Sequence, residues 1–85
     1  SVFAELVKKH GRKHIHFWRT HRHAEVDFVL DLRASILPIE VKINFRNFKS
    51  NAVNSFCKKY KAKDYKVVGL DGDKRNEHCI YPWQL

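Results

Sequence analysis

Apolar residues recur with the period of a helix in two segments of the chain. In residues 2–10 they fall on one stripe of a helix, and Gly11 can end that helix. A second stripe follows Asn47 or Ser50, either of which can cap a helix, and it reaches Tyr60. The stripes consist of Val2, Phe3, Leu6 and Val7, and of Phe48, Ala52, Val53, Phe56 and Tyr60. The pattern predicts two amphipathic helices.

Elsewhere apolar and polar residues alternate with the period of a strand. Strands are expected over residues 13–19, 25–32, 36–43 and 65–70, and residues 79–83 can add a short edge strand. The order is helix, three strands, helix and strand. It predicts an α/β domain of the order αβββαβ, with a mixed sheet and a helix packed on each side.

The charged residues of the second and third predicted strands are sorted by face. Alternate side chains of a strand point to opposite faces, and the register is set by a tight turn at residues 33–34 or, since that turn lacks Asn-Gly, by a longer loop of the same parity. The facing pairs on one side are Val26 with Val41, Phe28 with Ile39, Leu30 with Leu37, and Leu32 with Ser35. On the other side Asp27 lies opposite Glu40, and Glu25 lies opposite Lys42.

This convergence of charges suits a divalent cation. Two neighbouring carboxylates repel each other, and a cation between them removes the repulsion. Carboxylate oxygens with water suit Mg²⁺ or Mn²⁺ better than zinc. Lys42, beside Glu40, can polarise a water or stabilise negative charge that develops on phosphorus. A structural alternative is an ion pair of Lys42 with Glu25 or Glu40 on an exposed sheet face.

The composition of the chain limits the number of domains and the classes of binding partner that we expect. The chain has 85 residues, 44% of them hydrophobic, which predicts one folded domain. A formal net charge of +8 favours nucleic acid as partner, with a membrane surface second, although basic residues can also form only a solvated surface. No apolar run is long enough to span a bilayer, so we expect a soluble cytoplasmic protein without membrane contact. Cys57 and Cys79 form no CxxC pair, so they indicate neither a disulfide framework nor a zinc ribbon. We expect both to be small buried hydrophobic residues.

Together the motifs resemble a known superfamily. Asp27, followed after 12 residues by Glu40-Val41-Lys42, looks like the signature of the PD-(D/E)XK nucleases, which have the restriction-endonuclease-like fold. More narrowly, FWRTHRHAEVDFVL and ILPIEVK are similar to the C-terminal domain of prokaryotic, often archaeal, AAA+-type ATPases. The resemblance implies Mg²⁺ or Mn²⁺ held by Asp27, Glu40 and the Val41 carbonyl, with Lys42 as the catalytic cation. It also implies an ATPase domain upstream in the same chain.

Basic residues near this predicted site are candidates for contact with a DNA backbone. They are Arg19, His21, Arg22, His23, Arg46 and Lys49. His14 and His16, with the two histidines of the following loop, can instead build a zinc or nickel site, although no cysteine accompanies them. Trp18 can stack on a base or belong to the core.

Two classes of function follow from these features. The first is a metal-dependent nuclease, or a nuclease-derived domain, that acts on DNA by in-line attack of an activated water. The second is a catalytically silent module of the same fold that docks DNA or a protein for an ATPase. A regulatory protein-interaction domain is a third possibility. One feature departs from the superfamily: the acid expected on the first helix precedes Ser1, and Glu5 points away from the apolar stripe.

Overall fold

The computed structural model describes residues 2–19, 25–32, 35–74 and 76–85, with Glu25 described by its backbone alone. The helices and strands are α1 (Val2–His10), β1 (Ile15–Arg19), β2 (Glu25–Leu32), β3 (Ser35–Asn44), α2 (Asn51–Tyr60), β4 (Lys66–Asp71) and β5 (Cys79–Ile80). Short 3₁₀ turns are η1 (Arg12–His14), η2 (Phe45–Asn47) and η3 (Pro82–Gln84). The predicted order of helix, three strands, helix and strand is confirmed. None of the described helices is long and apolar enough to cross a membrane.

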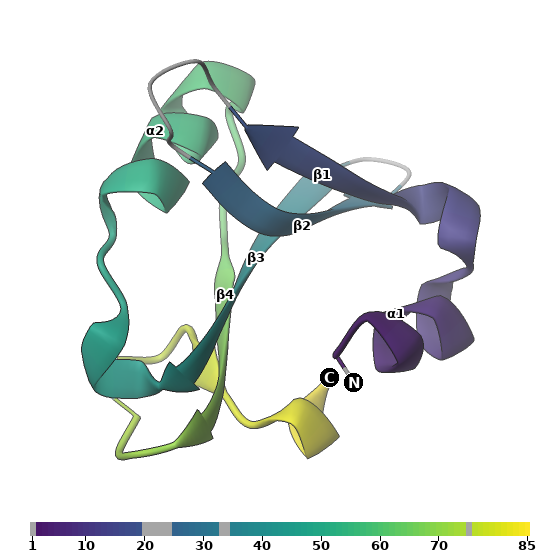
Figure 1. Cartoon of the computed structure of the whole chain (residues 1–85). Coiled ribbons are helices and arrows are strands. Elements are labelled where there is room, and N and C mark those ends of the chain that lie inside the picture. The colour runs from purple at the N-terminus through teal and green to yellow at the C-terminus, as the bar shows by residue number, and fades with distance from the viewer. Residues whose placement is uncertain (1, 20–24, 33–34, 75) are drawn as a thin grey trace.

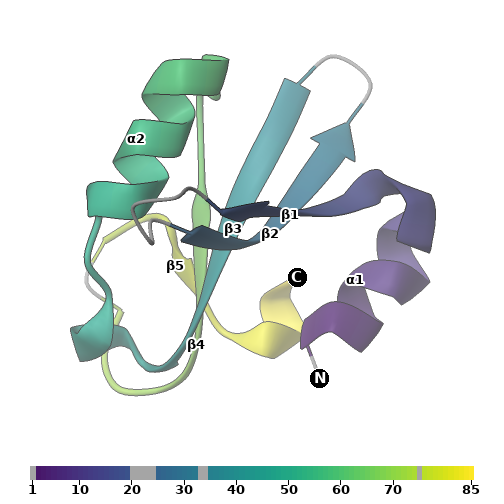
Figure 2. The same cartoon turned by 45° about the horizontal axis from the view of Figure 1, so that its top comes forward.

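The strands form one mixed sheet in the order β1-β2-β3-β4-β5. The β1–β2 and β2–β3 pairs are antiparallel, whereas the β3–β4 and β4–β5 pairs are parallel. The connection from β3 to β4 carries α2, as a parallel pair requires. Figures 1 and 2 show the two helices on opposite sides of this twisted sheet. The predicted mixed sheet with a helix on each side is therefore confirmed.

Strand boundaries differ from the predicted ones: β3 extends one residue further at each end, β4 is shifted by one residue, and the first and last strands are shorter than predicted. β1 begins at Ile15 rather than at Lys13, because Gly11 has a positive φ of 84° and is followed by the turn η1. The last strand ends at Ile80, because Pro82 lacks an N–H and begins η3. Both changes shorten strands that the alternation made longer.

Each helix covers its own apolar core. Leu6 of α1 is 1% exposed and packs with Leu30, Ile39 and Val68 on one face of the sheet. On the other face, α2 covers a cluster that contains Val26, Val29 and Phe56, and a further cluster gathers around Phe45 and Val67. Leu85 packs against the α1 core, so the C-terminal end of the chain lies on the α1 side of the sheet (Figure 1).

The predicted hairpin register is confirmed over most of its length. Strands β2 and β3 align Phe28 with Ile39, Leu30 with Leu37, and Leu32 with Ser35. The residues of the predicted turn, 33–34, lie outside the described residues. Alternation alone therefore predicts the register of β2 with β3 from Phe28 to Leu32, because a slip of one residue would move the apolar side chains to the wrong face.

A bulge interrupts the pairing of β1 with β2. The aligned pairs are Ile15 with Leu30, His16 with Val29, Trp18 with Val26, and Arg19 with Glu25. Phe17 therefore faces two residues of β2, Asp27 and Phe28. An extra residue of this kind reverses which face the strand presents beyond it.

The prediction that Val26 shares a face with Phe28 and pairs with Val41 is wrong for this reason. Val26 is 1% exposed and packs with Val29 and Phe56 on the α2 side of the sheet. The aligned residues of β2 and β3 end at Phe28, so Val26 has no partner in β3. Nothing in the sequence EVDFVL, which contains neither Gly nor Pro, marks the bulge.

Candidate functional site

Strands β2 and β3 separate at the position of the two predicted metal-binding acids. Among the described residues, the backbone pairing stops at Phe28 and Ile39, one residue short of Asp27 and Glu40. Beyond this point side-chain carboxylates accept the backbone N–H groups. The Asp27 N–H donates to Oε1 of Glu40 at 3.3 Å, and the Val41 N–H donates to Oδ2 of Asp27 at 2.7 Å. Each carboxylate thus accepts a hydrogen bond from the opposite strand. We call Asp27, Glu40, Val41 and Lys42 the fork.

Glu40 is the buried acid of the fork. Glu40 is 6% exposed and lies among apolar residues of the sheet. An unpaired charge at such a buried position would be costly. Two contacts offset that cost: the Asp27 N–H, and the Lys42 Nζ, which lies 3.8 Å from Oε2. The predicted convergence of Asp27, Glu40 and Lys42 is present. Lys42 pairs with Glu40 as the structural alternative expected, but the pair is largely buried rather than on an exposed face.

The donor set of the fork fits a hard divalent cation. Mg²⁺ is commonly held by one or two carboxylates together with waters and substrate phosphates, and Asp27 and Glu40 supply two carboxylates from two strands. The N–H and C=O of an extended residue point to the same side, so the Val41 carbonyl also faces β2. No group of three His, Cys, Asp or Glu side chains suited to a metal occurs within the described residues. The oxygen donors of the fork are of the kind that Mg²⁺ and Mn²⁺ prefer over zinc, but in the described chain they form a pair of carboxylates rather than a group of three.

A cleft of about 760 Å³ opens beside the fork. Asp27 and Val41 line it together with residues of α1, β1, β2 and β4. Its lining is mostly apolar, and its charged members in the described part of the chain are Arg19 and Asp27. Glu40 and Lys42 do not line it, so the fork lies at its edge. The cleft was not predicted from the sequence, because it depends on how α1 and the separated strands are placed.

The structure places the predicted basic residues in three groups. Arg19 lines the cleft. Arg46 lies in η2 and borders a separate hollow of about 340 Å³ with Lys74, and Lys49 is exposed between η2 and α2. The remaining predicted residues, His21, Arg22 and His23, lie outside the described residues. Among Arg19, Arg46 and Lys49, the predicted basic residues that the structure describes, Arg19 is the one that shares a cleft with Asp27.

The structure bears on the predicted roles of Trp18, as a base-stacking or a core residue, and of His14 and His16, as zinc or nickel ligands. Trp18 is half-buried: it packs edge-on against Phe56 at 5.2 Å and donates its indole N–H to the Tyr60 hydroxyl, and it also lines the cleft. His14 lies in η1 rather than on a strand face, and His16 faces Asp31 at 3.9 Å. Neither takes part in a metal-binding group within the described ranges.

Glu5 does not replace the first-helix acid. It is exposed on α1 and pairs with Lys8 at 3.8 Å, as expected for a residue one helical turn away. Glu5 also does not line the cleft. The prediction that Glu5 points away from the sheet is confirmed.

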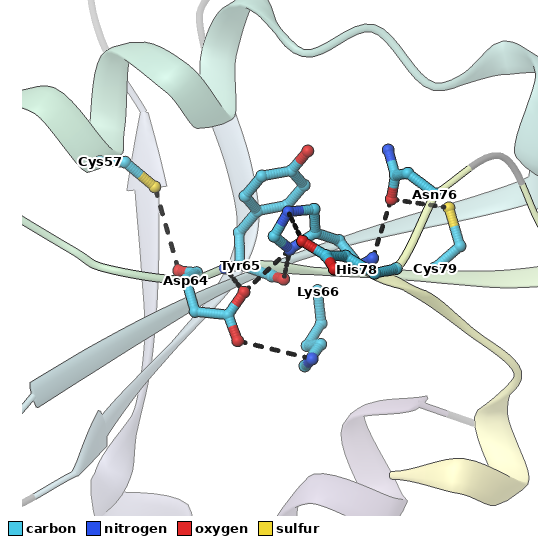
Figure 3. A network of polar contacts seen from close by, with 8 residues as sticks. Cys57, Asp64, Tyr65, Lys66, Asn76, His78 and Cys79 are labelled. Carbon is cyan, nitrogen blue, oxygen red and sulfur yellow. Dashed lines mark hydrogen bonds and ion pairs between the residues drawn. The ribbon is translucent and has the colours of Figure 1, made fainter.

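A second polar cluster, which the sequence did not indicate, ties the start of β4 to the chain before β5 (Figure 3). Oδ1 of Asp64 accepts the Tyr65 N–H at 2.8 Å and contacts Nδ1 of His78 at 2.8 Å. Its Oδ2 lies 3.5 Å from Nζ of Lys66, and the His78 ring stacks on Tyr65 with centroids 3.9 Å apart. Asn76 accepts the His78 N–H. We call Asp64, Tyr65, Lys66, Asn76 and His78 the Asp64 network.

The electrostatics of the Asp64 network follow from these contacts. Partial desolvation favours the protonated form of Asp64, but the Tyr65 N–H, His78 and Lys66 outweigh it and lower the pKa of this carboxyl. Burial, and then the nearby Asp64 charge, raise the pKa of the Cys57 thiol. Cys57 and Cys79 are free thiols, and Cys79 is buried as predicted, whereas Cys57 is half-buried.

Comparison with known proteins places the chain in a family. Neither the curated proteins nor the solved structures contain a match to the chain. One family matches nearly the whole length, over residues 1–84, and its description is Domain of unknown function (DUF4143). Since that match spans α1, every strand of the sheet and the fork, the chain belongs to the DUF4143 family.

Proposed function

We propose that this chain is a metal-dependent nuclease, or a nuclease-derived DNA-binding domain, of the PD-(D/E)XK type with a restriction-endonuclease-like core. The fork is the observation that carries the proposal: two carboxylates and a lysine from two separated strands meet at the edge of a cleft. The order αβββαβ and the bulge at Asp27 also support it, because bulges often direct side chains next to active sites.

In this proposal each residue of the fork has a role. Asp27, Glu40 and the Val41 carbonyl would hold Mg²⁺ or Mn²⁺, which would polarise a phosphoryl oxygen and lower the pKa of water. Water attacks phosphorus and loses a proton to solvent, and the bond from phosphorus to the leaving oxygen breaks as that oxygen takes a proton from solvent. Lys42, with Nζ held 3.8 Å from Glu40, stabilises the negative charge that develops on the phosphoryl group.

The proposed partners follow from charge and from the resemblance. The net charge of +8 attracts a polyanion, and Arg19 lines the same cleft as Asp27, where its guanidinium is suited to a phosphate. Arg46 and Lys49 are exposed and supply further phosphate contacts. The substrate is then DNA in the cytoplasm, and the domain serves an ATPase that lies upstream in the same chain.

A catalytically silent module is the second candidate, and the hydrogen bonds of the fork favour it. One oxygen of Asp27 and one of Glu40 already accept backbone N–H groups, as they would if the acids only satisfied the strand ends. In the described part of the chain no third acid joins them. Such a module would bind DNA or a protein without cutting.

Titration with Mn²⁺ tests the metal site. Paramagnetic broadening should reach the amide signals of Asp27, Glu40 and Val41 before those of His14 and His16, and Glu40→Gln should remove this order. Asp64→Asn is the matched control, because it alters an acid outside the fork and should leave the broadening unchanged. Broadening at the histidines alone would contradict the site, whereas Mn²⁺ binding at the fork without cleavage of any DNA would favour the silent module.

A further inference from the structure

Phe17 is an exposed aromatic side chain in the middle of an edge strand. It is 72% exposed in β1, although Ile15, two residues earlier on the same strand, is 7% exposed. A single exposed apolar residue is ordinary, but Phe17 lines the cleft beside the fork. Its place in the cleft, rather than its exposure alone, points to a ligand.

Three phenylalanine rings form one wall of this cleft. The ring of Phe17 lies 6.4 Å from that of Phe3 with an angle of 21° between planes, and 5.7 Å from that of Phe28. Phe3 and Phe28 are themselves stacked at 5.9 Å. Since the rings come from α1, β1 and β2, they support one another and hold Phe17 in place while much of its surface stays accessible.

The other walls carry charge that suits one nucleotide. Arg19, two residues after Phe17, has a planar group of donors that matches a phosphate. The volume of about 760 Å³ lies within the range of about 300–1,000 Å³ that is usual for small-molecule sites. Aromatic faces beside a cation are how proteins bind single-stranded nucleic acid.

We propose that this cleft takes an unpaired nucleobase, so that the domain prefers single-stranded or frayed DNA to intact duplex. The inference rests on the proposed DNA function and adds the class of substrate. In a duplex each base is stacked on both faces and cannot offer a face to Phe17 unless it leaves the helix. The net charge of +8 favours a polyanion over an apolar protein segment as occupant.

Binding of three labelled oligonucleotides tests the inference. Fluorescence anisotropy in metal-free buffer, which prevents cleavage, compares a 12-nucleotide strand, the duplex of the same sequence, and a strand with abasic sites at its centre. The normal strand should bind about tenfold more tightly than the abasic strand and the duplex. Phe17→Ala should remove that advantage and leave duplex affinity unchanged, whereas Phe17→Trp should keep it.

Ile43→Ala is the matched control. Ile43 is 77% exposed in β3 and does not line the cleft, so its loss should leave the preference intact. Equal binding of all three oligonucleotides by the unaltered chain would overturn the inference but not the DNA function. An unaltered preference in a folded Phe17→Ala variant would also overturn it, because the preference would then arise away from the cleft. Absence of all DNA binding at low salt would instead contradict the DNA function itself.

Discussion

The fork and the Asp64 network both use carboxylates to accept backbone N–H groups, the fork where the β2–β3 pairing ends and the network at the start of β4, but they differ in burial and surroundings. In the fork, Glu40 is 6% exposed, and a cleft of about 760 Å³ lies beside it. In the Asp64 network, the Asp64 side chain is 49% exposed, and its contacts secure the start of β4. Burying an ionised acid costs free energy of folding, because the charge loses its hydration. The comparison therefore marks the fork as the candidate for chemistry and the network as a local support.

Two lysines allow this comparison to be tested directly. The Nζ of Lys42 lies 3.8 Å from Glu40, and the Nζ of Lys66 lies 3.5 Å from Asp64, with side chains 33% and 32% exposed. Lys42→Ala should lower the rate of DNA cleavage by about 10²–10³-fold, comparable to the loss of an oxyanion-hole donor, because the charge acts mainly in the transition state. Single-turnover cleavage in Mg²⁺ measures the effect.

Lys66→Ala is the control for that measurement, because it removes a lysine of similar exposure whose ion pair of similar length lies outside the fork. It should leave the cleavage rate unchanged, and both variants should keep the Mn²⁺ response of the fork. Equal cleavage by the unaltered chain and Lys42→Ala would contradict a catalytic role for Lys42. The fork would then be the strand-end support that the silent module requires.

A smaller effect concerns the packing of β4, the strand that pairs with β3 next to the fork. Gly69 of β4 aligns with Lys42, and an added Cβ there would lie 2.5 Å from the ring of Phe45, which is fully buried. Gly69→Ala should therefore lower the free energy of unfolding by about 1–3 kcal/mol, as expected for overpacking. Urea unfolding followed by far-UV circular dichroism measures it.

The exposed neighbour of Gly69 provides the control. Leu70 is 57% exposed, so Leu70→Ala should change the free energy of unfolding by less than about 1 kcal/mol. If Gly69→Ala costs no more than Leu70→Ala, the packing of Phe45 against β4 is looser than the structure indicates.

The parts of this molecule that were predicted correctly depend on local alternation. The register of Phe28 with Ile39 follows from an apolar face that a one-residue slip would expose. The bulge at Asp27 carries no Gly or Pro signal, so the burial of Val26 against Phe56 was missed. The convergence of Asp27 with Glu40 survived this error, because the carboxylates reach the opposite backbone through their side chains.

The cleft and the Asp64 network were missed for a different physical reason. Both depend on contacts between segments that are far apart in the chain. Phe3, Phe17 and Phe28 meet only when α1 packs across the sheet. Asp64 and His78 are separated by 14 positions and belong to segments with no periodic pattern. Periodicity within a segment carries no information about such pairs.

The smallest expected effect is the dependence of stability on pH through Asp64. Because its pKa is lowered in the folded protein, the ionised carboxyl stabilises the fold above the unfolded value of about 3.9, and this contribution is lost as the pH falls through the folded pKa. The side chain is 49% exposed, so solvent limits the gain to about 1 kcal/mol or less.

Urea unfolding of the unaltered chain and of Asp64→Asn, at intervals from pH 5 to pH 2, measures this contribution. The difference between the two in free energy of unfolding should be largest at pH 5 and should shrink toward pH 2. The other carboxyl groups titrate in both proteins, so their contributions cancel in the difference. A difference that stays constant over this range would mean that Asp64 stabilises the fold through hydrogen bonds that do not need its charge. The Asp64 network would then differ from the fork, where the proposed metal site requires ionised acids.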